Sequence, residues 1–262
     1  MPELPEIEHL AASLRSTIVG RTIADTRCRQ PKMLNLPPEE FARQARGRVV
    51  AVTRRGKSCL LRLDRGSIWL HLGLGGEVSL AERPEGEPQL ALVLDDGRQL
   101  TVDKTFMGHA HFFGEDDLPR RWQDFGPEPL GEQFTLADLK SLLANRAKQA
   151  VKALLMDQAR LAGIGNVYSD EILHAASLHP ARSAGSLTEE ETVRLYDAIR
   201  SVLQEAVAAG GAAEYTDVRG ERGHYQMRIH GAKICRTCGG PASKASFGGR
   251  TAYFCAVCQR AQ

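Results

Sequence analysis

Residues 235–258 read CRTCGGPASKASFGGRTAYFCAVC and contain two Cys-x-x-Cys pairs, Cys235 with Cys238 and Cys255 with Cys258, separated by sixteen residues. Two such pairs at this separation supply four thiolates, the tetrahedral ligand set of a structural zinc ion. A redox-active pair would need only one Cys-x-x-Cys and a βαβ setting. The stretch therefore predicts a zinc-binding β-hairpin, with one structural Zn²⁺ as the cofactor.

The region around this motif is basic. The whole chain has a formal net charge of only +2, but from Tyr215 to the C-terminus eight Lys and Arg residues stand against two acidic residues. A basic patch on a near-neutral body is typical of a surface that binds nucleic acid. A solvated basic face explains the charge equally well by itself, so the zinc motif decides in favour of DNA as the partner.

Length and composition are those of a globular protein of one large or two ordinary domains. The apolar runs are far shorter than the roughly 18 residues that cross a bilayer. The N-terminus, MPELPEIEHL, carries acids where a signal peptide carries Lys or Arg. We therefore expect a cytoplasmic protein without a membrane partner, in which Cys28 and Cys59 are buried as small hydrophobic residues.

The part of the chain before the hairpin divides into a β-rich and a helical region. Pro5 fits the first position of a helix, and Ile7, Leu10 and Leu14 form its apolar stripe. From Ile18 to about Phe113 short β-type runs alternate with Gly and Asp-Gly turn signals. This pattern predicts an antiparallel sandwich or barrel.

A polar, Pro-rich linker separates this region from a series of helices. Thr135 and Asp138 resemble a capping box, and Gly210 with Gly211 marks the end of the last helix. Helical patterns cover 136–144, 147–158, 166–177 and 187–209. We expect an α+β fold with an N-terminal helix and β-sandwich over 1–115, a linker over 116–132, a helical domain over 133–232 and a zinc finger over 233–262.

The N-terminus offers a nucleophile. Removal of Met1 in front of the small Pro2 leaves a secondary amine, and an amine with a pKa near 8 is roughly one-tenth neutral at pH 7, against a few parts in ten thousand for lysine. Glu3 and Glu6 beside it suit proton transfer at a glycosidic bond. By itself, however, PELPE also fits a helix start with capping acids.

Six ordered stretches decide between these interpretations, because they resemble the formamidopyrimidine-DNA glycosylase and endonuclease VIII family. The resemblance implies a β-sandwich domain, a helix-two-turns-helix domain and a zinc finger that together hold damaged DNA. It also implies a base-excision repair enzyme that removes oxidised bases and nicks the strand by β,δ-elimination. The stretches are PELPEIE at 2–8, RRGK at 54–57, LHLGLGG at 70–76, FGPEPLG at 125–131, LLMDQARLAGIGNVYSDEILHAASLHP at 154–180 and the terminal cysteine pairs with GRTAYFCAVCQ.

The resemblance assigns catalytic roles to the first group of residues. Pro2 would attack C1′ of the damaged nucleotide and form a Schiff base, and Glu3 would act in the proton transfers of sugar-ring opening. Glu6 would support the sugar and the amine. Lys57 would contact the phosphate beside the lesion, and His71 would contact the DNA backbone.

A second group of residues would hold DNA from the helical region and the hairpin. Asn166, after the glycines of GIGN, would cap a helix and bind a phosphate at its N-terminus. Lys152 matches a lysine near the damage pocket. Arg250 matches the arginine at the finger tip that grips the phosphates flanking the flipped nucleotide.

The loops that fill the gap left by a flipped base depart from the family pattern. The family commonly uses a Met, an Arg and a Phe, whereas Leu74, Thr105 and Met107 occupy these positions. Leu74 and Met107, or Phe106, can still wedge into the base stack. Thr105 has no guanidinium to read the opposite base. The segment 214–233 is also short beside the lesion-capping loop of the family. The preferred lesion, the opposite-base preference and the choice of duplex or single strand therefore stay open.

Two other classes of protein compete with this hypothesis. A catalytically weak DNA-binding protein of the same fold would keep the DNA grip and lose the chemistry. A structural zinc-ribbon module of a ribosomal or transcription assembly would explain the hairpin and the helices, but not the N-terminus. We expect a bifunctional DNA glycosylase and abasic-site lyase that acts as a monomer.

Overall fold

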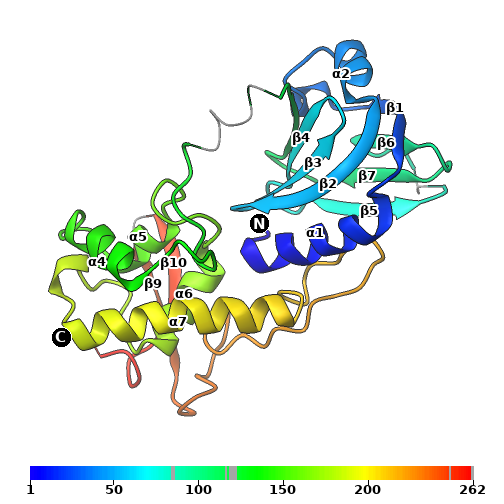
Figure 1. Ribbon diagram of the computed structural model, residues 1–262. Helices are drawn as coiled ribbons and strands as arrows, with labels where there is room; N and C mark the ends of the chain where they lie inside the picture. Colours follow the sequence, from blue (N-terminus) through cyan, green and yellow to red (C-terminus); the bar gives the residue numbers. More distant parts are fainter. Residues whose placement is uncertain (84–85, 116, 118–122, 248, 261–262) are drawn as a thin grey trace. The chain divides into compact units, whose positions relative to one another are not determined.

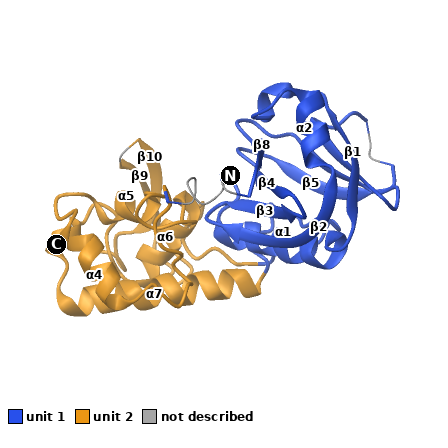
Figure 2. Ribbon diagram, turned by 45° about the horizontal axis from the view of Figure 1, so that its top comes forward, with its two compact units in different colours: residues 1–123, 210–224 blue, residues 124–209, 225–262 orange. Residues whose placement is uncertain are grey.

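The computed structural model describes residues 1–83, 86–115, 117, 123–247 and 249–260. They form two compact units, one of residues 1–123 and 210–224 and one of residues 124–209 and 225–262 (Figure 2). Residues 210–224, which follow the last helix, thus return to the first unit. The predicted domain boundaries at 115, 132 and 232 stay predictions, and part of the predicted linker lies outside the described residues.

The first unit begins with helix α1 (Leu4–Ile18), shown in blue in Figure 1. Glu3 is the N-cap residue, and the Glu6 carboxylate accepts a hydrogen bond from the Glu3 backbone N–H at 2.8 Å. This capping box starts the helix at Leu4, one residue before the expected first position at Pro5. The buried stripe of the helix is the predicted one, Ile7, Leu10 and Leu14.

An antiparallel sheet of eight strands, in the order β5-β7-β6-β1-β2-β3-β4-β8, makes up most of the first unit. Between β1 and β2 only two residue pairs are in register, so the sheet folds there into two four-stranded halves, which confirms the predicted sandwich. The strands are β1 (Thr22–Cys28), β2 (Gly47–Arg55), β3 (Ser58–Leu63), β4 (Gly66–His71), β5 (Glu77–Ala81), β6 (Leu90–Leu94), β7 (Gln99–Asp103) and β8 (His109–Phe113).

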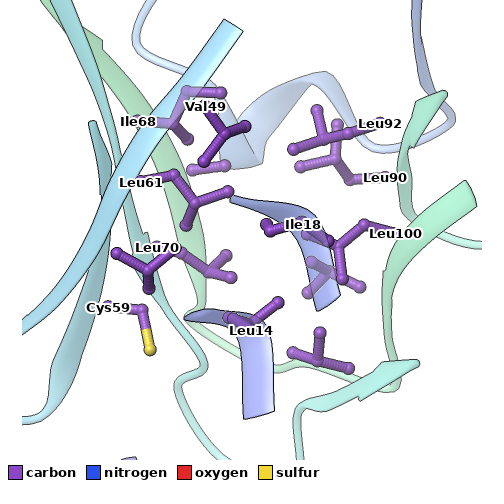
Figure 3. Close-up of a cluster of buried hydrophobic side chains, with 14 of the residues drawn as sticks. Leu14, Ile18, Val49, Cys59, Leu61, Ile68, Leu70, Leu90, Leu92 and Leu100 are labelled. Carbon is purple, nitrogen blue, oxygen red and sulfur yellow. The ribbon is translucent and has the colours of Figure 1, made fainter. Parts of the chain in front are cut away.

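The core of this unit lies between the two halves of the sheet. Figure 3 shows Leu14 and Ile18 of α1 between the side chains of both halves. Each fully buried Leu or Ile contributes roughly 1.5–3 kcal/mol of hydrophobic stabilisation, so α1 and the residues at its N-terminus are held firmly in place. The labelled side chains of the halves are Val49, Cys59, Leu61, Ile68 and Leu70 on one side and Leu90, Leu92 and Leu100 on the other.

Helical segments interrupt the region predicted as β structure. A 3₁₀ turn (Pro31–Met33) and helix α2 (Pro38–Ala45) follow β1. Helix α2 forms because Pro38 suits its first position and Phe41 and Ala45, one turn apart, are both buried. Cys59 is buried as expected, whereas Cys28 is only half-buried, at the end of a strand.

The second unit contains the four predicted helices and the hairpin. The Thr135–Asp138 capping box is confirmed, since Thr135 Oγ1 accepts from the Asp138 N–H. In the described residues, no helix is both long and apolar enough to span a membrane. The elements are α4 (Leu136–Ala144), α5 (Val151–Met156), α6 (Asn166–Ala175), a 3₁₀ turn (Ala184–Ser186), α7 (Glu189–Ala208), β9 (Ala242–Phe247) and β10 (Arg250–Cys255).

Candidate active site and nucleic-acid interface

A cavity of about 450 Å³ in the first unit lies at the N-terminus of α1. Pro2 lines it, together with the loop after β4 and the returning segment 210–224. A volume of this size is in the range of small-ligand sites. Six of its thirteen lining residues have polar side chains: Glu6, Glu77, Glu214, Tyr215, Thr216 and Arg222.

The Glu6 carboxylate is fixed at this cavity by two backbone N–H groups. Its Oε2 accepts from Glu3 at 2.8 Å and its Oε1 from Ala212 at 2.9 Å, while the side chain is buried. Gly211 makes the second contact possible, because it has a φ of +81° and a Cβ there would lie 2.6 Å from Glu6 Oε1. Glu6 therefore lines the same cavity as Pro2, and Glu3, the next residue along the chain, is buried.

Replacing Gly211 with alanine is expected to lower the free energy of unfolding by about 1–3 kcal/mol, because the positive φ and the clash with Glu6 both strain the variant. Glu6 would also move, so abasic-site cleavage should fall more than tenfold. Gly97→Ala is the matched control, since Gly97 has a φ of +86° and nothing within 4 Å of its would-be Cβ. Equal activity of the two variants, measured alongside their thermal unfolding, would contradict this role of Gly211.

The N-terminal amine of the unprocessed chain lies in the same surroundings. The Met1 amine donates a hydrogen bond to the Tyr215 hydroxyl at 2.8 Å. Burial lowers the pKa of this amine, and nearby Lys57 adds to the effect, while the carboxylates of the first turn oppose it. Burial likewise raises the pKa of Tyr215, so its hydroxyl stays protonated. These surroundings favour a neutral, nucleophilic amine at the start of the chain.

Lys57 follows Gly56 in the turn between β2 and β3. Arg54 ties this turn to α1, because its Nε donates to Glu8 Oε2 and its Nη1 to the Gly56 carbonyl, both at 3.0 Å. Burial raises the pKa of Glu8, but hydrogen bonds from Arg15 and Arg54 outweigh it, so the net pKa is lowered and the pair stays charged. Lys57 is thereby held on the same unit as Pro2.

His71 ends β4 and is oriented by its own loop. The Gly73 N–H donates to His71 Nδ1 at 3.1 Å, which leaves Nε2 to carry the proton of the neutral ring. Burial, and secondarily Lys57, lowers the pKa of this imidazole. Its ring stacks on that of His109 at a centroid distance of 5.1 Å. A neutral His71 can donate a hydrogen bond through Nε2 to an anionic ligand.

Two loops meet at an exposed apolar tip, a name used here for Leu74, Phe106 and Met107. The backbones of Leu74 and Phe106 exchange hydrogen bonds of 2.8 and 2.9 Å. The exposed fractions of the three residues are 44%, 67% and 73%. Thr105 instead is buried, and its Oγ1 donates to the Leu72 carbonyl at 2.5 Å. The structure thus exposes Phe106 as well as the expected Leu74 and Met107.

In the second unit, Asn166 is the first residue of α6 and Gly165 is its N-cap. The expectation that Asn166 caps the helix is therefore wrong; a glycine can occupy that position. Asn166 Oδ1 is buried without a hydrogen-bond partner among the described residues. Turning the amide would place Nδ2 there as a donor. The side chain at the N-terminus of the helix, where the helix dipole is positive, suits an anion.

Lys152 lies beneath this helix terminus and is only 1% exposed. Its Nζ donates to Asp170 Oδ1 at 2.6 Å, to Ser169 Oγ at 2.8 Å and to the Asn166 carbonyl at 3.3 Å. Its predicted contact with DNA stays a prediction, and the geometry gives it a supporting position behind Asn166.

Helix α6 also fixes the hairpin that carries Arg250. Asp170 Oδ2 accepts from the Tyr253 N–H at 3.0 Å and lies 2.7 Å from His230 Nδ1. The Glu171 carboxylate accepts from the backbone N–H groups of residues 228, 229 and 230. Arg250 is exposed at the first position of β10. Helix α6 thus carries Asn166 and, through Asp170, holds the strand that carries Arg250. Both residues are predicted to contact DNA.

The four predicted cysteine ligands come together. Their sulfur atoms all lie within 4.8 Å of one another, with 3.9 Å between Cys235 and Cys258 and 3.5 Å between Cys238 and Cys255. Four sulfurs at about 2.3 Å from a tetrahedral zinc ion would be about 3.8 Å apart. His174 Nε2 lies 3.2 Å from Cys235 Sγ and can orient it. The cluster can hold a metal ion.

Sequence reasoning did not single out several residues of these sites. Glu77 lines the cavity directly after the LHLGLGG stretch, so its position next to a motif was the available signal. Tyr215 and Arg222 also line it, but no local pattern marks them. Asp170 lies inside the stretch 154–180. Its role became visible only in the structure, where it is buried and joins Lys152 to the hairpin.

Family models and relatives match almost the whole chain. Residues 1–107 match the formamidopyrimidine-DNA glycosylase N-terminal domain, and residues 125–217 match the H2TH domain of the same glycosylases. A formamidopyrimidine-DNA glycosylase of Heliobacterium modesticaldum is 39% identical over 99% of this chain and 100% of its own length. One from Bacillus subtilis is 38% identical over 99% of each chain.

Solved structures agree with these matches. A complex between the Lactococcus lactis Fpg and DNA containing an abasic site superposes with a TM-score of 0.92, at 29% identity over 99% of this chain and 100% of that one. The MutM (Fpg) protein from Thermus thermophilus gives a TM-score of 0.88, at 35% identity over 98% of each chain.

Proposed function

The chain belongs to the formamidopyrimidine-DNA glycosylase family, and from that premise we propose that it removes oxidised bases from DNA and cleaves the resulting abasic site. It is a bifunctional DNA glycosylase and abasic-site lyase of base-excision repair. The observation that carries the proposal is the placement of Pro2 and Glu6 at one cavity, with Glu3 directly after Pro2 and both carboxylates buried. The proposal includes a monomer that acts in a bacterial cytoplasm.

The proposed reaction starts after Met1 has been removed. The Pro2 nitrogen forms a bond to C1′, the bond from C1′ to the base breaks, and the base leaves with a proton. Glu3 delivers a proton to the ring oxygen as the sugar opens, which leaves an iminium ion between Pro2 and C1′. Loss of a C2′ proton then expels the 3′ phosphate, and a second elimination expels the 5′ phosphate.

The remaining predicted residues hold the substrate in this proposal. Glu6 is locked by two backbone N–H groups, so it can orient the sugar and the amine without moving. Lys57 and His71 would contact phosphates from the first unit, Asn166 and Arg250 from the second. Phosphate contacts of this kind position DNA and supply most of the affinity.

We assign the four-cysteine cluster to Zn²⁺, because four thiolates at these separations fit the tetrahedral zinc geometry. The ion would supply folding energy to the hairpin and take no part in the chemistry. Cys235, Cys238, Cys255 and Cys258 would be its ligands.

Glu3→Gln is expected to reduce base excision by about 10²–10⁴-fold, since an amide cannot transfer the proton that opens the sugar ring. Cleavage of a preformed abasic site, whose sugar opens spontaneously, should fall much less. Single-turnover rates on both substrates measure the difference, and Glu39→Gln, an exposed change on α2, serves as the control. Equal losses on the two substrates would contradict the role given to Glu3.

The function is tested by incubating the purified protein with a panel of duplexes and single strands that each carry one oxidised purine or pyrimidine. We expect release of at least one oxidised base and strand ends with phosphates on both sides of the gap. The same panel identifies the preferred lesion. Tight binding of damaged duplexes with neither base release nor cleavage would instead favour a catalytically weak binding protein.

A further inference from the structure

We propose that the apolar tip fills the gap left by the flipped nucleotide without reading the base on the opposite strand, so that this protein recognises its lesion equally well opposite any of the four bases. The inference rests on the proposed function, because it needs a duplex with one nucleotide displaced into the cavity. It adds the opposite-base specificity of that site to the proposed function. It follows from the side chains that are exposed at the apolar tip.

The tip is held rigidly. Besides the two hydrogen bonds between Leu74 and Phe106, the backbones of both loops touch, since a Cβ at Gly73 would lie 2.2 Å from the Phe106 carbonyl oxygen. On the other side of the contact, a Cβ at Gly108 would lie 2.1 Å from Thr105 Oγ1. The large exposed fractions of Phe106 and Met107 are therefore imposed by a fixed backbone.

The polar side chains of these loops point to other partners. Thr105 is buried, with Oγ1 donating to the Leu72 carbonyl, and its backbone N–H and carbonyl both bind the Gln89 side chain at 2.8 and 3.1 Å. Lys104 Nζ forms an ion pair with Glu77 at 2.8 Å. The side chains that the loops present at the tip itself are apolar.

The position of the tip argues for DNA as its occupant. Leu72, Gly75 and Gly76 of the same loop line the cavity that contains Pro2, so Leu74 lies between residues that border this cavity. When a displaced nucleotide occupies that cavity, the gap in the base stack lies next to the tip. The unpaired base of the opposite strand lies there as well. Apolar side chains can occupy such a gap and stack against the exposed base faces.

The chemistry of the tip explains the lack of discrimination. Telling one base from another takes directional hydrogen bonds, and a good bidentate pair is worth about 1–3 kcal/mol. Stacking on an aromatic or apolar side chain tolerates every base, because every base has a π-face. Leu74, Phe106 and Met107 offer only contacts of the second kind.

The test measures dissociation constants for four duplexes that carry a stable abasic-site analogue opposite cytosine, thymine, guanine or adenine. We expect the four dissociation constants to lie within about threefold of one another. A tenfold ratio would correspond to a difference of roughly 1.4 kcal/mol in binding free energy. Preference for one opposite base by tenfold or more would overturn the proposal. So would failure to prefer these duplexes over an intact one.

Two variants sharpen the measurement. Met107→Arg places a guanidinium at the tip and should create a preference for guanine or cytosine of at least fivefold, whereas Val19→Arg adds the same charge at the far end of α1, where the side chain is 43% exposed, and should leave the four affinities level. Changing all three tip residues to alanine should reduce the preference for abasic over intact duplex at least tenfold, equally for all four opposite bases. An unchanged preference would show that the tip does not enter the gap.

The binding ratios separate this inference from the proposed function. Level affinities together with no covalent adduct on an abasic site would contradict the proposed chemistry and support the inference. A strong opposite-base preference together with normal cleavage would support the proposed chemistry and contradict the inference.

Discussion

Adding two residues, Gly-Ser, in front of Pro2 is expected to reduce the rate of abasic-site cleavage by about 10³-fold or more, because correct placement of the nucleophile supplies much of the rate. In this variant the Pro2 nitrogen becomes part of a peptide bond and loses its lone pair to resonance. The new terminal amine lies up to roughly 7 Å from the old position, at about 3.5 Å per residue.

Single-turnover cleavage of an abasic duplex measures this effect, with the affinity for an abasic-site analogue measured in parallel. Affinity should fall far less than rate, since the phosphate contacts are kept. The same two residues added after Gln262 serve as the control. Cleavage by the extended variant within tenfold of the unmodified protein would show that another group is the nucleophile.

Replacing Cys255 with serine is expected to abolish stoichiometric zinc binding and to weaken binding of an abasic-site duplex at least about 100-fold, since structural zinc supplies roughly 10–16 kcal/mol of apparent folding energy in small zinc modules. A two-stranded hairpin is marginal without such support. Arg250, at the start of β10, would lose its fixed position, as would Tyr253, which binds Asp170.

Metal content by native mass spectrometry and the dissociation constant check this expectation together. Cys28→Ser is the matched control, because Cys28 is a half-buried cysteine of the first unit outside the cluster. It should keep one zinc ion and its full affinity. Full affinity of a metal-free Cys255→Ser protein would contradict the structural role of the ion.

Sequence reasoning succeeded where the relevant residues are close along the chain. The spacing of the cysteines predicted the cluster, and the Thr135–Asp138 box predicted the start of α4. For PELPE it left two interpretations, a capped helix start and a catalytic pair. The structure shows the capped helix start, in which Glu6 Oε2 accepts from the Glu3 N–H, and it adds a hydrogen bond from the returning segment to Glu6 Oε1. The catalytic role of the pair stays a prediction.

It could not succeed where partners are distant in the chain. Tyr215 bonds to the amine of Met1, 214 residues away, and only the return of the chain to the first unit after α7 makes that contact. Lysine is usually a surface residue, and the burial of Lys152 depends on its ion pair with Asp170 in the next helix, α6. Asn166 was misplaced by one position, because a glycine can serve as the N-cap.

The most direct test of the central claim, that the Pro2 amine carries the chemistry, is borohydride trapping on an abasic-site duplex followed by peptide mass mapping. We predict one adduct per protein, on the α-nitrogen of Pro2 in a peptide that lacks Met1. An adduct on a lysine side chain such as Lys57, or none on a protein that cleaves the strand, would contradict the claim.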